Sequence, residues 1–309
     1  MAKKTYFYID DVIWVFRDLT RQRPACLFDQ CLLKPLKEAH DKYGLKVVLN
    51  AFYQTDNYYG NDEFSLADMT DAYKDQWEEA SDWLRIGLHA RQEFPDYPYV
   101  NASYEQVKQD FENMKREVQR FAGDKTFSCS VYNPHWNPVS KAGVQALYDC
   151  GVRLMSATLG PRHPYTGDPS TLPYGHAARL LLNRQPETML YRRGTLNKAI
   201  DSSICGYNHL TGDVEDLVKN TLAYVTDEDT GMHYKRLCGG PTLNLSSTEG
   251  LEEEFSKYLG NEYIGYASHE QYSFPDYFAY QPEHNEKILE AARILSQAGY
   301  TYFFVDELV

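Results

Sequence analysis

Short apolar runs alternate with longer amphipathic segments through the first half of the chain. Runs typical of buried strands span residues 5–9, 45–53, 84–90, 126–133 and 152–158. Helical spacing of apolar residues appears at 27–44, 64–83, 103–123 and 140–151. Strands that alternate with helices favour a parallel sheet with helical cover, so the pattern predicts an α/β fold, most simply a barrel.

The alternation is interrupted between residues 159 and 248. Within this stretch the sequence predicts a loop, a hairpin near 178–193, a possible strand at 202–210 and a helix near 213–225. Regular patterning returns with a strand at 262–269, a helix at 282–299 and a closing strand at 300–308. We therefore expect a single domain, 1–309, with an irregular insertion, 159–248, that shapes the substrate cleft.

Composition excludes some partners and indicates a compartment. The 44 acidic and 31 basic residues give a net charge of −13, which disfavours a nucleic-acid or anionic membrane surface. No stretch reaches about 18 uncharged apolar residues, so no transmembrane segment is expected. The first apolar run contains Asp10 and Asp11 and lacks a cleavage site, which argues against a signal peptide. Six scattered cysteines without a C-x-x-C pair favour a cytoplasmic protein, and no feature indicates an oligomeric state.

Acidic and histidine side chains recur where the predicted strands end. These ends carry Asp10-Asp11, His89 with Glu93 beyond it, Asn133-Pro134-His135-Trp136, Asn208-His209 and Ser268-His269-Glu270. In parallel βα folds the C-terminal ends of the strands meet on one face. Each residue alone has an ordinary structural interpretation, such as a turn or a hydrogen-bonded rim. Their joint placement indicates a functional pocket.

The order of these strand ends resembles that of the polysaccharide deacetylases of the NodB-homology type, carbohydrate esterase family 4. The resemblance covers segments 5–12, 84–95, 127–151 and 262–308. Its matching motifs are Tyr8-Ile9-Asp10-Asp11 for the paired aspartates, Ile264 to His269 for a late strand ending in histidine, and, loosely, Asn133 to Trp136 for an arginine-proline-proline-aromatic sequence. It implies a barrel of seven or eight βα units.

The resemblance also implies roles for individual residues. Asp10 would be the catalytic base, His269 the general acid, and Asp11 and His89 metal ligands. The family has a second histidine four residues after the first, but this chain has Glu93 there, which we expect to be the third ligand. Such a set can hold Zn²⁺, the ion we expect, or Mn²⁺, Fe²⁺ or Co²⁺.

The implied reaction is metal-assisted hydrolysis of an N- or O-acetyl group on a carbohydrate. Asn133 stands where the family has an arginine that orients the base. Aromatic side chains can stack on sugar rings, although core packing explains them equally well. The expected substrate-binding residues are Trp14, Asn133, His135, Trp136, His209 and Tyr272.

Two alternatives remain open from the residues. A glycoside hydrolase would pair Asp10 or Asp11 with Glu93 or Glu270 and need no metal. A carbohydrate-binding protein on a deacetylase scaffold that has lost activity would bind sugar without turnover. Bound metal distinguishes the deacetylase from the hydrolase, and turnover distinguishes it from the binding protein.

Overall fold

The computed structural model describes residues 3–56, 60, 62–94, 98–99, 102–136, 139–159, 209–210, 212–227 and 230–309. For 158–159, 209–210 and 212–215 it describes the backbone alone. The predicted hairpin at 178–193 and most of the predicted strand at 202–210 lie outside the described residues.

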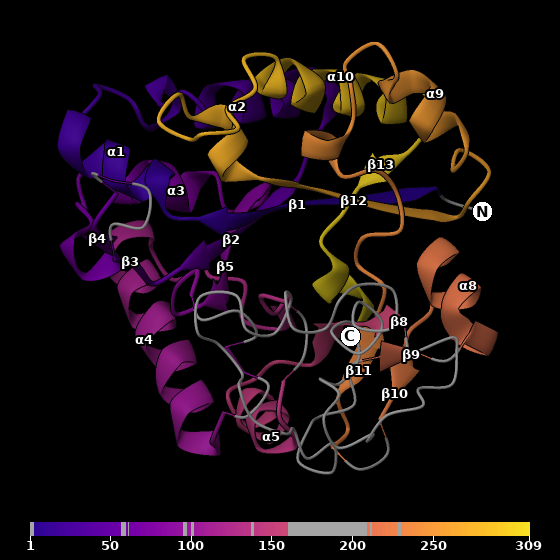
Figure 1. Ribbon diagram of the computed structural model, residues 1–309, viewed down its shortest axis with the longest axis horizontal. Helices are drawn as coiled ribbons and strands as arrows, with labels where there is room; N and C mark the ends of the chain where they lie inside the picture. The colour runs from indigo at the N-terminus through magenta and orange to yellow at the C-terminus, as the bar shows by residue number, and fades with distance from the viewer. Residues whose placement is uncertain are drawn as a thin grey trace.

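Parallel strands form a closed ring. They are β1 (Lys4–Val12), β2 (Val47–Phe52), β5 (Leu84–Ala90), β6 (Val131–Tyr132), β7 (Leu154–Ser156), β11 (His233–Lys235) and β12 (Tyr263–His269). A bridge between Ile86 and Phe127 joins β5 to the segment leading into β6, and β6 pairs with β7 and β7 with β11. The chain after β11 returns to β12 through the bridge between Thr242 and Ala267. The predicted α/β barrel is confirmed (Figure 1).

Four further pairings lie outside the ring. They are β3 (Gln54–Thr55) with β4 (Phe64–Ser65), β8 (Thr158–Leu159) with β9 (His209–Leu210), β10 (Val225–Thr226) with β11, and β13 (Thr301–Tyr302) with β1. The predicted closing strand 300–308 is therefore short, and a 3₁₀ turn follows it at Val305–Leu308.

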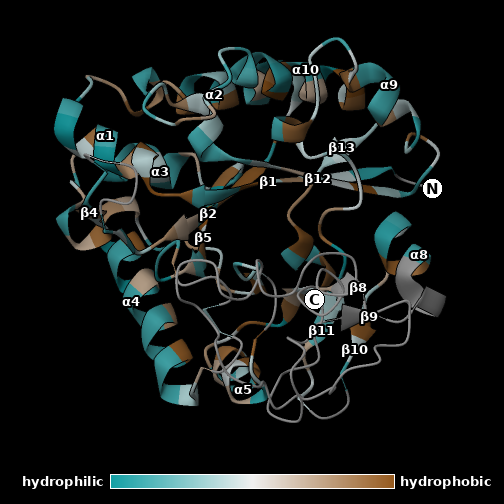
Figure 2. Cartoon of the chain, viewed as in Figure 1, coloured by the Kyte–Doolittle hydropathy of each residue, from teal (hydrophilic) through white to brown (hydrophobic). Residues whose placement is uncertain are grey.

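Helices cover the ring on its outside. They are α1 (Trp14–Gln22), α2 (Leu33–Tyr43), α3 (Lys74–Glu79), α4 (Tyr104–Ala122), α5 (Lys141–Asp149), α8 (Gly212–Asn220), α9 (Leu251–Ser256) and α10 (His284–Gln297). In Figure 1, α2 and α10 lie side by side above β1 and β12, and they pack against each other. Figure 2 shows hydrophobic residues on the strands and polar residues on the outer helix faces. The buried apolar residues form two clusters, and their burial holds the barrel together.

Several helix ends follow from local sequence. The hydroxyl of Ser140 accepts a hydrogen bond from the backbone N–H of Gly143, as expected for the cap of α5. Ser103 caps α4 in the same way. Gly44 ends α2 with a φ of 71°, a conformation that glycine adopts without steric cost.

Other expectations of secondary structure were wrong. The segment 64–83, predicted as one helix, contains β4, a 3₁₀ turn at Leu66–Asp68 and the short α3. Helix α1 lies where a loop was expected, because Val12-Ile13-Trp14 reads as a continuation of the preceding apolar strand. In the described part of the stretch 159–248, α8 lies where a helix was predicted near 213–225, but the barrel strand β11 was not predicted.

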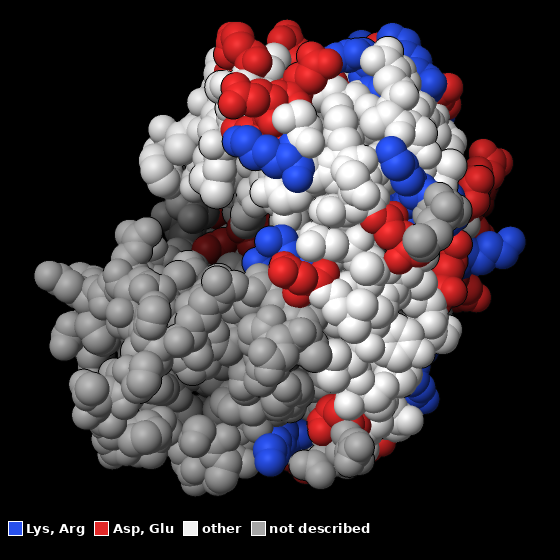
Figure 3. All heavy atoms as spheres, turned by 90° about the vertical axis from the view of Figure 1, so that its right-hand side faces the viewer, with Lys and Arg blue, Asp and Glu red and all other residues white. Residues whose placement is uncertain are grey.

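Within the described residues, every helix is too short or too polar to cross a membrane. On the face shown in Figure 3, basic and acidic side chains are interspersed among the residues drawn in colour. The described residues of this face therefore form no continuous basic surface of the kind that nucleic-acid binding requires.

Candidate functional site

A cavity of about 710 Å³ opens at the C-terminal ends of the barrel strands. Side chains from the ends of β1, β5, β6, β7 and β12 line it, together with residues that follow β11. The lining includes these predicted site residues: Asp10, Asp11, His89, Glu93, Asn133, His135, Trp136 and His269. The parallel topology thus brings together residues that are far apart in the sequence.

A break in the regular geometry of β1 directs both of its aspartates into the cavity. Successive side chains of a regular strand point to opposite faces, so Asp10 and Asp11 would normally diverge. Here the pairing of β1 with β2 shifts register between Ile9 and Val12, and Asp11 has a φ of 61°. Aspartate tolerates this left-handed conformation better than most residues. The bulge therefore re-aims Asp11 beside Asp10.

Three donor atoms form a nearly equilateral triangle. Asp11 Oδ1 lies 3.3 Å from His89 Nε2 and 3.3 Å from His135 Nδ1, and the two nitrogens lie 3.2 Å apart. A tetrahedral ion with bonds of about 2.0 Å places its ligands about 3.3 Å apart. Asp11 Oδ1 is buried without a hydrogen-bond partner among the described residues. The residues present therefore fit a divalent metal ion.

The far side of each ligand is fixed by a hydrogen bond. His89 Nδ1 donates to the carbonyl of Asn133 at 2.8 Å, and His135 Nε2 donates to the carbonyl of Glu93 at 3.1 Å. In a neutral ring the remaining nitrogen, which faces the triangle, then carries the lone pair. Gln271 Nε2 donates to the second oxygen of Asp11 at 3.1 Å. Such outer hydrogen bonds orient metal ligands in known sites.

The charges around the three donor atoms favour a bound cation. Burial raises the pKa of Asp11, but the adjacent His135 and His89 rings outweigh it and hold that pKa well below its usual range. Burial lowers the pKa of His89, but Asp10 and Asp11 outweigh it and raise the pKa to about 9. Burial lowers the pKa of His135. The two carboxylates thus retain a proton on His89 that a metal ion would displace.

Two amide side chains hold Asp10 through hydrogen bonds. Asn133 Nδ2 donates to its two oxygens at 3.0 and 3.1 Å, and Asn50 Nδ2 donates to Oδ1 at 2.8 Å. Asn133 therefore contacts the predicted base directly. Asn50 was missed, although one amide side chain inside the fully buried strand β2 was a usable signal.

His269 lies beside the aspartates at the end of β12. Its Cα is paired with that of Asp10 across the parallel strands. Its Nδ1 lies 3.0 Å from Asn244 Oδ1, which can only accept, so Nδ1 carries the hydrogen and Nε2 is left to act on a substrate. Asn244, on a 3₁₀ turn at Leu243–Leu245, had no recognisable signal in the sequence.

Glu93 lies outside the triangle, and His135 takes the place that we expected for it. The Glu93 carboxylate is 4.0 Å from His135 Nε2, the nitrogen that faces away from the other donors. The donor set is therefore one carboxylate and two imidazoles, with the second imidazole from the end of β6. The chemical composition is that implied by the family resemblance, although its position in the sequence differs.

The remaining predicted residues lie in different surroundings. Trp14 is 2% exposed and packs edge-on against Phe274, so it belongs to the core and the expectation of a sugar platform there was wrong. Trp136 is half-buried in the cavity wall. Tyr272 is half-buried with its ring 6.5 Å from that of His269. The side chain of His209 lies outside the described residues.

Glu270, a candidate carboxylate of the glycoside hydrolase alternative, is sealed in the interior. It is fully buried, and its oxygens accept hydrogen bonds from the backbone N–H groups of Ile13, Trp14 and Val15. These are the first groups of α1, so Glu270 caps that helix from the end of β12. This arrangement leaves it no access to a sugar.

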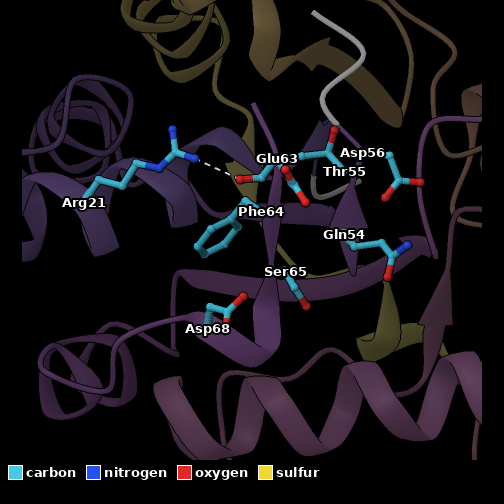
Figure 4. Close-up of a pocket in the computed structure, with 8 residues that line it drawn as sticks. All are labelled: Arg21, Gln54, Thr55, Asp56, Glu63, Phe64, Ser65 and Asp68. Atoms are coloured by element: carbon cyan, nitrogen blue, oxygen red, sulfur yellow. Dashed lines mark hydrogen bonds between the residues drawn. The ribbon is translucent and has the colours of Figure 1, made fainter. Parts of the chain in front are cut away.

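A second cavity, of about 730 Å³, lies between α1 and the β3–β4 hairpin. Figure 4 shows Arg21 reaching toward the hairpin, where its Nη2 donates to the carbonyl of Glu63 at 2.9 Å. The described lining contains no histidine or cysteine. The chemistry that the sequence predicted lies in the first cavity.

Comparisons with known proteins concern the fold. No family model and no curated protein matches the sequence. A 4-alpha-glucanotransferase from Thermococcus litoralis has 10% identity and a TM-score of 0.53 over 100% of this chain and 40% of that chain. A family 4 carbohydrate esterase from Streptomyces lividans has 10% identity and a TM-score of 0.45 over 98% and 92%. A mutant of a family 4 pseudoenzyme has 9% identity and a TM-score of 0.42 over 99% and 67%.

The chain is structurally similar to carbohydrate esterases of family 4. The glucanotransferase similarity, at 10% identity and a TM-score of 0.53, concerns the fold alone, so the chemistry is argued from the site.

Proposed function

We propose that this protein is a metal-dependent hydrolase that removes an N- or O-acetyl group from a carbohydrate. The observation that carries the proposal is the triangle of Asp11, His89 and His135, adjacent to an amide-held Asp10 and to His269. A divalent ion, Zn²⁺ by preference for this donor set, would supply Lewis acidity to the acyl carbonyl and to water.

Residues of the chain accept, position and donate the protons of the reaction. Asp10 accepts the proton of the attacking water, because its Oδ2 receives only one hydrogen bond among the described residues and keeps accepting capacity. Asn50 and Asn133 hold the carboxylate in place. His269, with Nδ1 fixed by Asn244, donates from Nε2 to the leaving amine or alcohol.

The site also bears on the alternatives. Burial of Glu270 against α1 removes both candidate carboxylate pairs that contain it, Asp10–Glu270 and Asp11–Glu270. A scaffold that only binds sugar has no need of three converging metal donors with oriented outer hydrogen bonds.

The test combines metal analysis with acetate release. Protein purified without added metal is expected to hold a stoichiometric divalent ion and to release acetate from acetylated saccharides until EDTA removes the ion. Asp10→Asn should retain the metal and lose roughly 10²- to 10⁴-fold in rate. Asp11→Asn should lose both metal and activity.

Asp110 provides a matched control. It is a buried aspartate on α4, outside the cavity, and it accepts a hydrogen bond from the Tyr99 hydroxyl at 3.1 Å. Asp110→Asn should keep both metal and activity. Acetate release that persists in EDTA and in Asp10→Asn would refute the proposed roles of the metal and the base.

A further inference from the structure

Two cationic side chains line the same cavity as the candidate metal site. Lys219 lies in the last turn of α8, and Arg236 directly follows β11. Both are half-buried. Arg236 Nε donates to the carbonyl of Cys238 at 2.9 Å. Within the described part of the chain, the other donors of these two side chains have no hydrogen-bond or ion-pair partner.

Other cations of the barrel that are shielded from water have partners, which are acids or, for Lys235, the backbone carbonyls of Val218, Thr221 and Ala223. Arg17 lies 2.8 Å from Asp18, and Arg85 lies 2.7 Å from Asp306. Removing a charge from water without a partner is unfavourable, so cations away from the surface are normally paired. The donors of Lys219 and Arg236 that lack a partner among the described residues lie at a cavity wall, and they therefore indicate an anion supplied by a ligand.

A glycine in the wall makes room for Lys219. A Cβ atom on Gly239 would lie 2.6 Å from Lys219 Cγ and 3.1 Å from the Lys219 carbonyl oxygen. Any residue larger than glycine at position 239 would therefore displace Lys219 and the end of α8. A lysine in the last turn also suits the helix dipole, but that effect explains only the charge and not its location on the cavity wall.

The charges within the cavity are separated by chain segment. Asp10, Asp11 and Glu93 come from the ends of β1 and β5, whereas Lys219 and Arg236 come from α8 and the chain after β11. The net charge of −13 gives the protein as a whole no attraction for anions. An anionic group would therefore be bound only through local contact with these two cations.

We propose that the cavity selects saccharides that carry a negatively charged group, a carboxylate or a phosphate, and that Lys219 and Arg236 bind that group. The inference rests on the proposed function, because it places the acetylated sugar in the same cavity. It assigns the substrate class, which the metal site alone leaves open.

Calorimetric titration with three sugars that share one acetylated ring tests the proposal. The probes are N-acetylglucosamine, N-acetylglucosamine 1-phosphate and N-acetylmuramic acid. Hydrogen bonds to charged groups are strong enough that both anionic sugars should bind at least about tenfold more tightly than the neutral one. The preference should persist in EDTA, where an anion has no metal to bind, and weaken at high salt.

Variants test which residues are responsible for the preference for anionic sugars. The double variant Lys219→Gln and Arg236→Gln should abolish the preference for both anionic sugars and leave affinity for N-acetylglucosamine within about twofold. Arg236→Glu should reverse the preference. Lys108→Gln is the matched control, since Lys108 is an exposed helix residue outside the cavity, and it should leave the preference intact.

Failure of this inference is distinguishable from failure of the proposed function. Equal affinity for all three sugars, or a preference that survives in the double variant, overturns the anion site, even if the protein hydrolyses acetyl groups. A preference for only one anion narrows the substrate class to carboxylate or phosphate and supports the site. Loss of the preference in the double variant supports the site even in a protein that holds no metal.

Discussion

Two regions of the molecule bury histidines, and they treat the ring nitrogens in opposite ways. In the candidate metal site, His89 and His135 each donate one N–H to a backbone carbonyl and direct the other nitrogen at Asp11. Behind β12, His284 has hydroxyl partners at both nitrogens, Ser268 and Ser273, each at 2.6 Å. Burial is complete or nearly so in both regions.

The proton positions around His284 can be assigned. The Ser273 hydroxyl donates to Asn285 Oδ1, so Ser273 Oγ accepts from Nδ1 of His284. Nε2 then accepts from the Ser268 hydroxyl. Every polar atom of this neutral ring has a partner, and nothing further is needed. The difference teaches that a buried histidine points to chemistry when its donor atoms converge without partners, and to structure when they are satisfied.

The strongest test of this comparison replaces a histidine with alanine in each region, in two separate variants. His135→Ala should weaken metal binding by at least roughly 100-fold, since even loss of an outer partner of a ligand costs up to that much. His284→Ala should leave the metal content unchanged. Elemental analysis and competition with a chromogenic chelator measure both.

Glu93→Gln tests whether the third metal ligand is His135, as the structure indicates, or Glu93, as the sequence predicted. Its backbone carbonyl still accepts from His135, so metal affinity should stay within about threefold of wild type. A loss comparable to that of His135→Ala would restore Glu93 as a ligand.

The second prediction concerns stability, for which we expect His284 to matter more than His135. His284→Ala leaves two buried hydroxyls short of a partner and creates a cavity, so the free energy of unfolding should fall by about 3 kcal/mol. Urea unfolding in EDTA measures it without a contribution from metal. A loss below about 1 kcal/mol would show that the Ser268–His284–Ser273 network is not a stabilising element.

Much of the barrel was readable from sequence because its longest elements are strongly patterned. Strand β5 was predicted with its observed bounds, and α4 and β12 within one residue at each end. Strands β6 and β7 are shorter than the strands predicted at 126–133 and 152–158, and β11 was not predicted, because runs of two or three residues carry little periodic signal. Their pairing with each other, rather than local preference, defines them.

The site was partly readable for a related reason. Asp10, Asp11, His89 and His269 were found because strand ends are local features that the fold gathers on one face. The choice between Glu93 and His135 depends on how the end of β6 meets β5, where His135 N–H donates to the carbonyl of His89 at 3.2 Å. That long-range contact, like the left-handed turn at Asp11, leaves no pattern in neighbouring residues.

The third prediction uses pH to probe the satisfied histidine. Burial lowers the pKa of His284 to about 3, against an ordinary value of 6.5. Below pH 6.5 the unfolded chain binds a proton that the folded chain does not, so stability from the neutral ring is present above that pH and lost below it. At pH 5 this loss is about 2 kcal/mol.

Comparison with His284→Gln isolates that contribution, because glutamine does not titrate. The stability difference between wild type and the variant should shrink by about 2 kcal/mol from pH 7 to pH 5, measured by urea unfolding in EDTA. A difference that stays constant with pH would mean that His284 takes up a proton inside the fold at no cost.

The smallest expected effect tests the outer hydrogen bond on the metal side. Gln271 lies on the 3₁₀ turn Glu270–Ser273, where its Nε2 donates to Asp11 and its Oε1 is buried without a partner among the described residues. Gln271→Leu keeps the approximate volume, removes the donor and also removes that unpaired oxygen. Metal affinity should therefore fall about tenfold while stability in EDTA stays within about 1 kcal/mol.

Gln30 supplies the matched control for this last change. It is also a buried glutamine, but its Oε1 accepts from the backbone N–H groups of Leu32 and Leu33 at the start of α2. Gln30→Leu should lower stability by about 1 to 2 kcal/mol, as the loss of a helix cap does, and leave metal affinity unchanged. If both variants change only stability, then the hydrogen bond to Asp11 serves packing, as the bonds to His284 do, and the contrast between the two regions is confined to the three donor atoms themselves.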